Sequence, residues 1–153
     1  DVLIFGTGFA SQAFHGDLIV TGGDGASLSD VWADGAEAYL GMTVPGFPNM
    51  FMIYGPNTNL NHNSIITMLE IQQDYVLRAI RETEARGAAA AVHAEVFDRF
   101  NERMQADMAS SAFSSGCSSW YKNAAGKVIN NWSGTVDQYR RAAEWNAEDY
   151  AWR

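Results

Sequence analysis

Apolar residues recur at helical spacing in two long segments of the chain. Residues 65–86 carry a stripe of large apolar side chains that predicts an amphipathic helix: Ile65, Leu69, Val76 and Ile80, with Met68 and Tyr75 beside them. Gly87 is expected to end this helix, and Asn63 or Ser64 to supply a capping oxygen at its start. The one polar break in the buried pattern is Gln72, whose amide would need an internal hydrogen-bond partner.

A second helical stripe follows, and shorter apolar runs predict strands. The stripe comprises Val96, Phe97, Phe100, Met104 and Met108. Continuous or nearly continuous apolar runs predict strands at residues 2–5, 18–20, 50–54, 88–93 and 127–132. Pro45 and Pro48 keep their segment extended, and a final helix is expected from Thr135 to about Tyr150. Strands mixed with helices indicate an α/β fold with an incomplete sheet and two or three amphipathic helices.

Composition and charge narrow the function. The 153 residues suffice for one domain, and a net charge of −8 argues against a nucleic-acid or anionic-membrane partner, since both bind to clustered positive charge. The one cysteine, Cys117, is expected to pack as a small hydrophobe, and no metal site is expected. No apolar run reaches membrane-spanning length, which favours a cytoplasmic location. The chain begins directly in an apolar run without Met, so its start is interpreted as a cut within a longer protein.

The joint between the run at residues 50–54 and the helix at residues 65–86 has the layout of a binding turn. It reads Gly55-Pro56-Asn57-Thr58-Asn59-Leu60-Asn61-His62-Asn63-Ser64. Glycine allows a ligand to approach the backbone, and the helix amino terminus offers N–H groups and partial positive charge to a phosphate or an electron-rich ring. A loop that only connects two elements is an equally good interpretation. His62 is either a proton shuttle or hydrogen-bond donor to a ligand, or a histidine that contacts backbone and solvent.

A second glycine-rich segment, Gly6-Thr7-Gly8, follows the first apolar run. It lacks a Gly-x-Gly-x-x-Gly fingerprint because position 11 is Ser. On its own it predicts a tight turn.

Several motifs in a fixed order resemble one enzyme family. They are Leu3 to Phe9, Leu28-Ser29-Asp30-Val31-Trp32, Ala38-Tyr39-Leu40-Gly41, Val44 to Phe51, Gly55-Pro56-Asn57-Thr58, Glu70-x-Gln72-x-x-Tyr75, and Gly116-Cys117-Ser118-Ser119-Trp120-Tyr121. Together they are similar to flavin-containing Baeyer–Villiger monooxygenases, in the branch that oxidises ketones. The resemblance implies that the chain is the carboxyl-terminal portion of a single FAD-binding, Rossmann-like domain, in which residues 1–9 form a returning strand and a Gly-Thr-Gly turn.

The resemblance also implies site residues and cofactors. Gly6, Thr7, Gly8, Gly55, Pro56, Asn57 and Thr58 would lie near FAD, while Asn59, Leu60, Asn61, His62 and Ile65 would line the substrate cavity. The reaction would insert one oxygen atom from O2 beside a ketone carbonyl after NADPH reduces FAD. The family's Gly-rich FAD and NADPH turns, its fingerprint motif and its catalytic arginine are absent here, so no catalytic residue is assigned. Asn61-His62 also departs from the family's usual Gly-His.

Three hypotheses follow. The first is one part of a Baeyer–Villiger monooxygenase that is inactive alone, since it lacks the amino-terminal FAD half and the NADPH domain, and that self-associates through exposed apolar surface. The second is a related N- or S-oxygenating flavin monooxygenase. The third is a stand-alone α/β module that binds a small ligand or a protein at the turn of residues 55–64.

Overall fold

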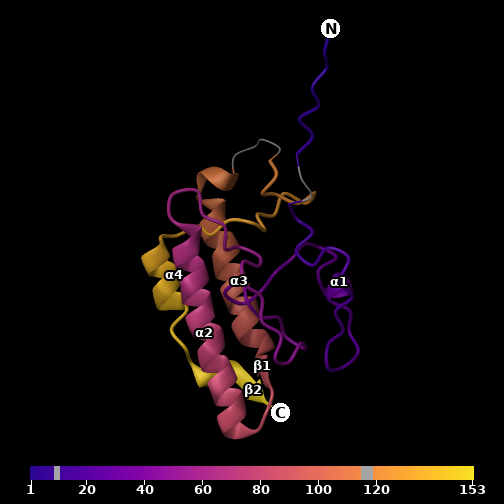
Figure 1. The fold of residues 1–153 in the computed structure, drawn as a ribbon. Helices are drawn as coiled ribbons and strands as arrows, with labels where there is room; N and C mark the ends of the chain where they lie inside the picture. The colour runs from indigo at the N-terminus through magenta and orange to yellow at the C-terminus, as the bar shows by residue number, and fades with distance from the viewer. Residues whose placement is uncertain (9–10, 115–118) are drawn as a thin grey trace.

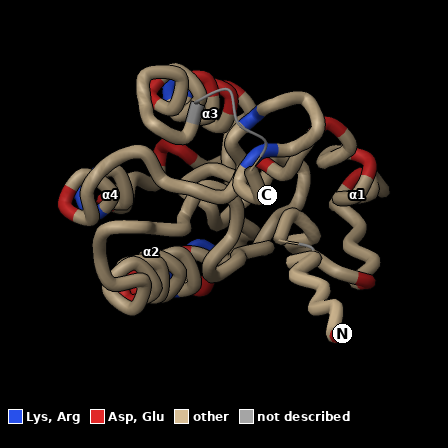
Figure 2. The backbone as a smooth tube through the Cα atoms, turned by 90° about the horizontal axis from the view of Figure 1, so that it is seen from above, with Lys and Arg blue, Asp and Glu red and all other residues tan. Residues whose placement is uncertain are grey.

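The computed structural model describes residues 1–8, 11–114 and 119–153, and it forms a helical body with a small sheet at one end (Figure 1). The elements are α1 (Leu28–Val31), α2 (Ile65–Arg86), β1 (Ala90–Val92), α3 (Ala94–Ala109), the 3-10 turn η1 (Ala112–Ser114), α4 (Val136–Ala142), the 3-10 turn η2 (Ala147–Asp149) and β2 (Tyr150–Trp152). Seen from above, α2, α4 and α3 surround central loop segments, and α1 lies on the opposite side (Figure 2). The α/β prediction therefore holds in its coarse form.

The longest helix, α2, has the predicted length and stop. It ends where Gly87 adopts a left-handed backbone at φ 62°, a conformation that costs glycine little. It begins at Ile65 as predicted, but Ser64 occupies the N-cap position without a side-chain capping bond. Asn63 Oδ1 accepts a hydrogen bond only from the N–H of Ser64, outside the helix. The predicted capping oxygen was therefore wrong.

The buried face of α2 also differs from the predicted one. The buried positions are Met68, Ile71, Gln72, Tyr75 and Ala79. From the predicted stripe, Ile80 is 44% exposed, and Ile65, Leu69 and Val76 are half-buried. At about 100° per residue, Met68 and Tyr75 lie on one side of the helix and Ile80 on the other. The predicted stripe therefore combined residues from two separate apolar stripes of the helix.

The main core forms where α2, α3, α4 and the sheet meet. Its large buried side chains include Met68, Met104, Met108, Tyr139 and Tyr150, and each contributes roughly 1.5–3 kcal/mol through burial. The strand at residues 88–93 is confirmed as β1, which pairs antiparallel with β2 in the register Ala90–Trp152 to Val92–Tyr150. A smaller core cluster beside α1 contains Leu28, Trp32, Val44 and Phe47.

Four other predicted strands are not formed. Residues 2–5 are extended but exposed, with Phe5 at 77%, and in Figure 1 the amino-terminal segment extends away from the body. Residues 18–20 and 50–54 lie in irregular backbone, and residues 127–132 make only isolated bridges. A strand needs a neighbour with which to exchange backbone hydrogen bonds, and within the described residues these runs have none along their length.

The carboxyl-terminal prediction was correct only at its start. Thr135 caps α4 through a full capping box with Gln138. The helix ends at Ala142, and the remaining residues form η2 and β2 in place of a continued helix. None of the helices in the described part of the chain is long and apolar enough to cross a membrane.

Candidate functional site

The turn at residues 55–58 is a buried, tightly packed unit. Gly55 and Gly41 lie back to back, so a methyl group added to Gly55 would meet the carbonyl oxygen of Gly41 at 2.3 Å. A methyl group on Gly41 would meet Thr58 Cγ2 at 2.1 Å. The Thr58 hydroxyl donates to the Gly55 carbonyl at 2.7 Å and closes the turn. Both glycines are therefore required by contacts within the chain, whatever binds outside it.

Asn57 fixes this turn to the distant segment 128–131. It adopts a left-handed backbone at φ 56°, which asparagine tolerates better than most residues. Its Nδ2 donates to the carbonyls of Val128 and Asn131, both at 3.0 Å. Its Oδ1 is buried and accepts no hydrogen bond from any described residue. A buried acceptor without a donor is costly, so Oδ1 is a position where a bound group could donate.

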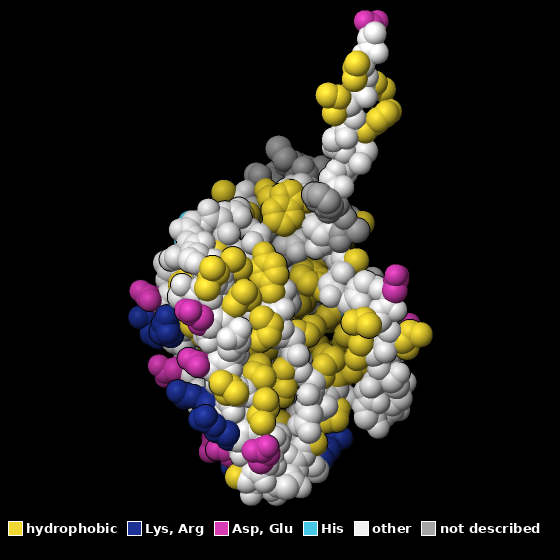
Figure 3. All heavy atoms as spheres, viewed as in Figure 1, with side chains coloured by type: hydrophobic (Ala, Val, Ile, Leu, Met, Phe, Trp, Pro, Cys, Tyr) yellow, Lys and Arg dark blue, Asp and Glu magenta, His cyan; other side chains and the backbone are white. Residues whose placement is uncertain are grey.

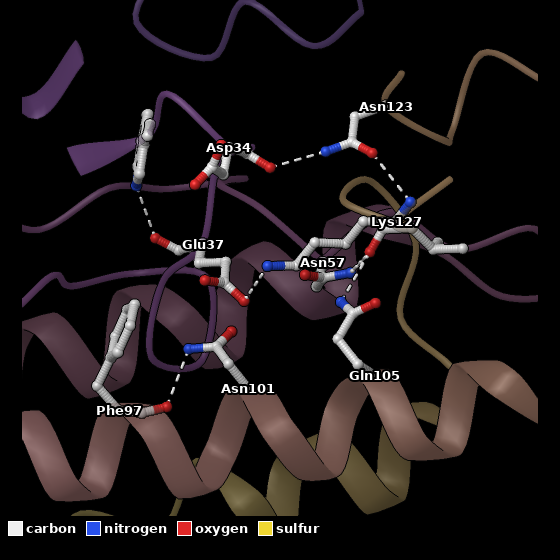
Figure 4. Close-up of polar contacts among 10 residues, drawn as sticks. Asp34, Glu37, Asn57, Phe97, Asn101, Gln105, Asn123 and Lys127 are labelled. Atoms are coloured by element: carbon white, nitrogen blue, oxygen red, sulfur yellow. Dashed lines mark hydrogen bonds and ion pairs between the residues drawn. The ribbon is translucent and has the colours of Figure 1, made fainter. Parts of the chain in front are cut away.

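A polar cluster holds segment 123–128 in place beside the turn (Figure 4). Lys127 Nζ pairs with Glu37 Oε1 at 2.6 Å, with both side chains about one quarter exposed. Asn123 Nδ2 donates to the Asp34 carbonyl at 2.9 Å. Gln105 of α3 donates to the same Val128 carbonyl that Asn57 uses, at 3.0 Å. The turn is thus connected to α3 and to the loop after α1.

The residues predicted to line the substrate cavity belong to one loop, which is held by hydrogen bonds at its first residues and is exposed further along. Asn59 pairs with segment 130–132 through backbone bonds to Asn130 and Trp132, and Leu60 is buried. Asn61 accepts a hydrogen bond of 3.3 Å from Asn131 Nδ2. His62 is exposed, and Ile65 is half-buried at the start of α2. These contacts define a fixed loop, and a role in lining a cavity stays a prediction.

The other predicted cofactor residues, Gly6, Thr7 and Gly8, lie apart from this turn. They belong to the exposed amino-terminal segment, and a methyl group added to Gly6 or Gly8 would meet nothing within 4 Å. The structure therefore does not bring the two glycine-rich segments together. Cys117 lies outside the described residues, as do Gly116 and Ser118 of its motif.

The turn is connected to the main core through buried polar side chains. Gln72 Oε1 accepts a bond of 2.9 Å from the Tyr54 N–H, and Gln72 Nε2 donates to the Tyr139 hydroxyl at 3.0 Å. That hydroxyl donates to the Leu40 carbonyl at 2.6 Å. The expectation that Gln72 needs an internal partner is confirmed. Burial raises the pKa of Tyr139 above its usual range, so the hydroxyl stays a neutral donor.

Two surface hollows lie elsewhere. One of about 430 Å³ is lined by His15, Trp32, Asp34 and Asn123 among others. The other, of about 460 Å³, includes Asp24, Pro48, His93 and Arg153 in its lining. Residues 55–65 line neither of them. Within the residues that the structure describes, no group of His, Cys, Asp or Glu is arranged to hold a metal ion.

The sequence reasoning missed Asn131, Gln105 and Lys127. Asn130 and Asn131 interrupt the apolar run Val128-Ile129-Asn130-Asn131-Trp132, and both are buried. Two adjacent amides inside such a run need partners. That interruption could have indicated from the sequence that this segment has buried polar partners.

Comparison with known proteins identifies the family. An FAD-binding monooxygenase of Aspergillus niger is 42% identical over 147 residues, which cover 92% of this chain and 24% of that protein. A Baeyer–Villiger monooxygenase of Pseudomonas aeruginosa is 41% identical, over 92% of this chain and 27% of that protein. The chain is homologous to one part of the Baeyer–Villiger monooxygenases. It spans about a quarter of the length of these curated relatives. No family model matches it.

Solved structures agree on the fold. A steroid monooxygenase bound to NADP superposes with a TM-score of 0.75 at 30% identity, over 88% of this chain and 26% of that one. OTEMO, in complex with FAD and NADP, superposes with a TM-score of 0.81 at 24% identity, over 96% of this chain and 28% of that one. The resemblance stated from the motifs is therefore confirmed at the level of the family.

Proposed function

We propose that this chain forms one wall of the FAD site in a Baeyer–Villiger monooxygenase, centred on the turn at residues 55–58. The observation that carries the proposal is the 42% identity to an FAD-binding monooxygenase, which extends over 92% of this chain and so includes most of its length. The remaining FAD half and the NADPH domain would come from polypeptide equivalent to the other three quarters of the relatives. Homology and the polar contacts of the turn support this role.

The residues of the turn fit one edge of a flavin ring and not the whole of FAD. Asn57 Oδ1 is a buried acceptor without a donor, and a flavin ring edge carries an N–H group that can donate. The 22-residue helix α2 begins after the turn and adds partial positive charge there. The diphosphate needs a glycine-rich turn at a helix start, and the sequence contains no Gly-x-Gly-x-x-Gly.

The residues of this chain would act by positioning. When bound and reduced by NADPH, FAD supplies the chemistry that turns a ketone, O2, NADPH and a proton into an ester, water and NADP+. Gly55 and Gly41 would keep the turn in one conformation through their close contact. Asn57 would hold it against segment 128–131, and the loop at residues 59–65 would form part of the cavity wall for the ketone.

A chimera tests this proposal. This chain would replace the matching 27% of the P. aeruginosa Baeyer–Villiger monooxygenase. We expect the chimera to purify with the blue and near-ultraviolet absorption bands of flavin and to oxidise NADPH when a ketone is supplied. A chimera that folds, as judged by circular dichroism and a cooperative melt, but binds no FAD would overturn the proposal. Sulfoxide formation without ester formation would favour the heteroatom-oxygenating alternative.

Two variants of the chimera examine the turn itself. Asn57→Ala removes the unpaired acceptor and two donated bonds, and we expect about a tenfold or greater loss of FAD affinity. Asn63→Ala, at an exposed position a few residues away, is the control and should leave affinity unchanged. The chain on its own is expected neither to oxidise NADPH nor to oxygenate a ketone. Ester formation by the isolated chain would contradict that expectation.

A further inference from the structure

The hydroxyl of Tyr39, a residue of the main core, points at a carboxylate. It donates a hydrogen bond of 2.8 Å to Asp149 Oδ2, and Tyr39 is only 8% exposed. Asn146 Nδ2 donates to the other carboxylate oxygen, Oδ1, at 3.1 Å. This second bond holds the carboxylate so that Oδ2 stays directed at the phenol. Burial, with Tyr75 beside it, raises the pKa of Tyr39, so the hydroxyl keeps its proton in the resting protein.

Three other tyrosines of the described chain are buried, but their hydroxyls meet no carboxylate among the described residues. Tyr75 and Tyr150 share a hydrogen bond of 2.9 Å between their hydroxyls. Tyr139 donates to the Leu40 carbonyl at 2.6 Å. A hydroxyl or a backbone carbonyl accepts a hydrogen bond but does not take up a proton at neutral pH, whereas a carboxylate can. Tyr39 is therefore the buried tyrosine whose proton can move to a neighbouring base.

The tryptophans packed in and beside this core have no base at their indole N–H groups. Trp132 and Trp152 donate to backbone carbonyls, and Trp145 Nε1 is buried without a partner among the described residues. The guanidinium of Arg86 lies 4.4 Å from the ring centre of Trp152, and a cation on that face opposes the removal of an electron from the ring. An oxidised indole would therefore keep its proton and its positive charge, which a buried position disfavours.

Packed side chains connect Tyr39 to the glycine-rich turn. The ring centre of Phe100 lies 5.3 Å from that of Tyr39 and 6.5 Å from that of Trp132. The Trp132 backbone N–H donates to the Asn59 carbonyl at 2.9 Å, in the loop that follows the turn. Gly41, two residues after Tyr39, also lies against the turn. Tyr39 is thus part of the packing that supports the turn.

Other aromatic rings lead from Asp149 toward the surface. Tyr150 follows Asp149 in the chain, and its ring centre lies 5.1 Å from that of Trp145 and 6.3 Å from that of Trp152. Both indoles are half-buried. Electrons tunnel readily between aromatic rings that are in contact, so an oxidant at the surface can draw an electron from the core without entering it.

We propose that Tyr39 and Asp149 form a redox-active pair that undergoes one-electron oxidation. Tyr39 gives one electron to the oxidant and its hydroxyl proton to Asp149 Oδ2, and so becomes a neutral tyrosyl radical beside a carboxylic acid. The oxidant is, by class, an oxygen radical: a hydroxyl radical that takes the electron becomes hydroxide. One electron from a dissolved reductant such as ascorbate, with the proton from Asp149, then restores the phenol and the carboxylate.

Such a pair would protect the region where O2 reacts. An oxygen radical formed beside the turn would take its electron from Tyr39, in place of attacking the side chains that shape the turn. This use of the pair rests on the proposed function, because it requires that O2 is reduced beside the turn. The redox property itself rests on contacts within the chain, and it can be measured without flavin.

Photochemical oxidation of the purified chain tests the pair, once exposed rings are removed. Hydrophobic side chains are exposed over much of the face seen in Figure 3. Tyr54 is 46% exposed and Trp120 53%, so both would react directly with a dissolved oxidant. The reference chain therefore carries Tyr54→Phe and Trp120→Phe. A laser flash in the presence of tris(bipyridine)ruthenium and persulfate produces a one-electron oxidant, and electron paramagnetic resonance detects the radical that forms in the chain.

Three variants of the reference chain locate the radical. The neutral tyrosyl signal expected from the reference chain should be lost in Tyr39→Phe. It should also be lost in Asp149→Asn, because an amide oxygen accepts the hydrogen bond but takes up no proton. Tyr75→Phe is the matched control and should keep the signal, since Tyr75 is buried but pairs with a hydroxyl. A signal that persists in either of the first two variants, or that Tyr75→Phe also loses, would overturn the proposal.

Deuterium exchange tests the proton step in the reference chain itself. The tyrosyl radical should form more slowly in D2O than in H2O, since the hydroxyl proton moves together with the electron. Equal rates in the two solvents would show that transfer to Asp149 takes no part in the oxidation. Flavin binding by the chimera is a separate measurement, so the redox pair and the proposed function can each fail alone.

Discussion

Gln72 donates a hydrogen bond of 3.0 Å to the hydroxyl of Tyr139, and neither side chain is exposed to solvent. The bond joins α2 to α4 across 67 positions of the sequence. Since Gln72 also accepts from the Tyr54 N–H, the same amide holds the segment that leads into the turn at residues 55–58. One side chain thus connects the main core to the proposed cofactor wall.

Gln72→Met tests this connection. The variant keeps the volume of the side chain but leaves the Tyr54 N–H without its acceptor and the Tyr139 hydroxyl without a donor. We expect the free energy of unfolding in urea to fall by about 2 kcal/mol. Gln73→Met on the exposed side of α2 should change it by less than about 0.5 kcal/mol. Equal effects at the two positions would show that the buried bonds contribute nothing.

Gly41→Ala tests the close contact of the two glycines. Position 41 has φ 68°, and the added methyl group would meet Thr58 Cγ2 at 2.1 Å. We expect a loss of at least about 3 kcal/mol from the free energy of unfolding. Gly46→Ala is the control, because φ is 83° there but nothing lies within 4 Å; it should cost only about 1 kcal/mol. Similar losses of unfolding free energy in both variants would show that backbone strain alone causes the destabilisation.

Alkaline pH should destabilise the fold. Burial raises the pKa of Tyr39, Tyr75, Tyr139 and Tyr150 above the ordinary value of 10.0. Below pH 10 the folded and unfolded chains both keep these protons, so the contribution of the four tyrosines to the free energy of unfolding is fully present. As pH rises through 10 the unfolded tyrosines ionise while the folded ones stay neutral, and stability falls by up to about 1.4 kcal/mol per pH unit for each tyrosine.

Urea midpoints measured from about pH 8 to pH 11 check this dependence. Tyr139→Phe should be less stable at neutral pH, because Gln72 and Leu40 lose a partner. Its stability should also fall less steeply above pH 10, with one ionising group fewer. A slope identical to that of the unchanged chain would contradict the assignment for Tyr139.

Thr135→Ala should destabilise α4. The Thr135 hydroxyl accepts from the Gln138 N–H at 3.2 Å, and Gln138 Oε1 accepts from the Thr135 N–H at 2.7 Å. We expect a loss of about 1 kcal/mol, seen as a lower urea midpoint. Ser64→Ala at the start of α2 is the matched control, since Ser64 makes no side-chain capping bond. A larger loss at position 64 than at position 135 would contradict the capping assignments.

The sequence predicted the helices better than the strands. The bounds of α2 and its stop at Gly87 depend on local patterns, and both are correct. A strand depends on a neighbour, so the apolar run at residues 50–54 could not reveal that its backbone would lie in irregular structure. β2 was missed because three residues after a 3-10 turn leave no period to detect.

The candidate site was predicted in position but not in its contacts. The motif at residues 55–58 was found from glycine, proline and the helix that follows. Its attachment to Asn131 was not, since residues 57 and 131 are 74 positions apart and no local pattern joins them. The choice of the buried face of α2 failed for a different reason. Two stripes of similar hydropathy, one near Met68 and one near Ile80, give no sign of which one meets the core.

The bonds from Asn57 to segment 128–131 join parts of the chain that are far apart in sequence. Helices α2 and α3 are made of contacts close in sequence and can form early, whereas Asn57 finds its partners only when a segment more than 70 residues later reaches the turn. During synthesis, residues 55–58 leave the ribosome long before their partners exist. The bonds made by Asn57 are therefore acquired late, and a chain that stops before Val128 would keep the contacts between Gly41, Gly55 and Thr58 but lack this attachment.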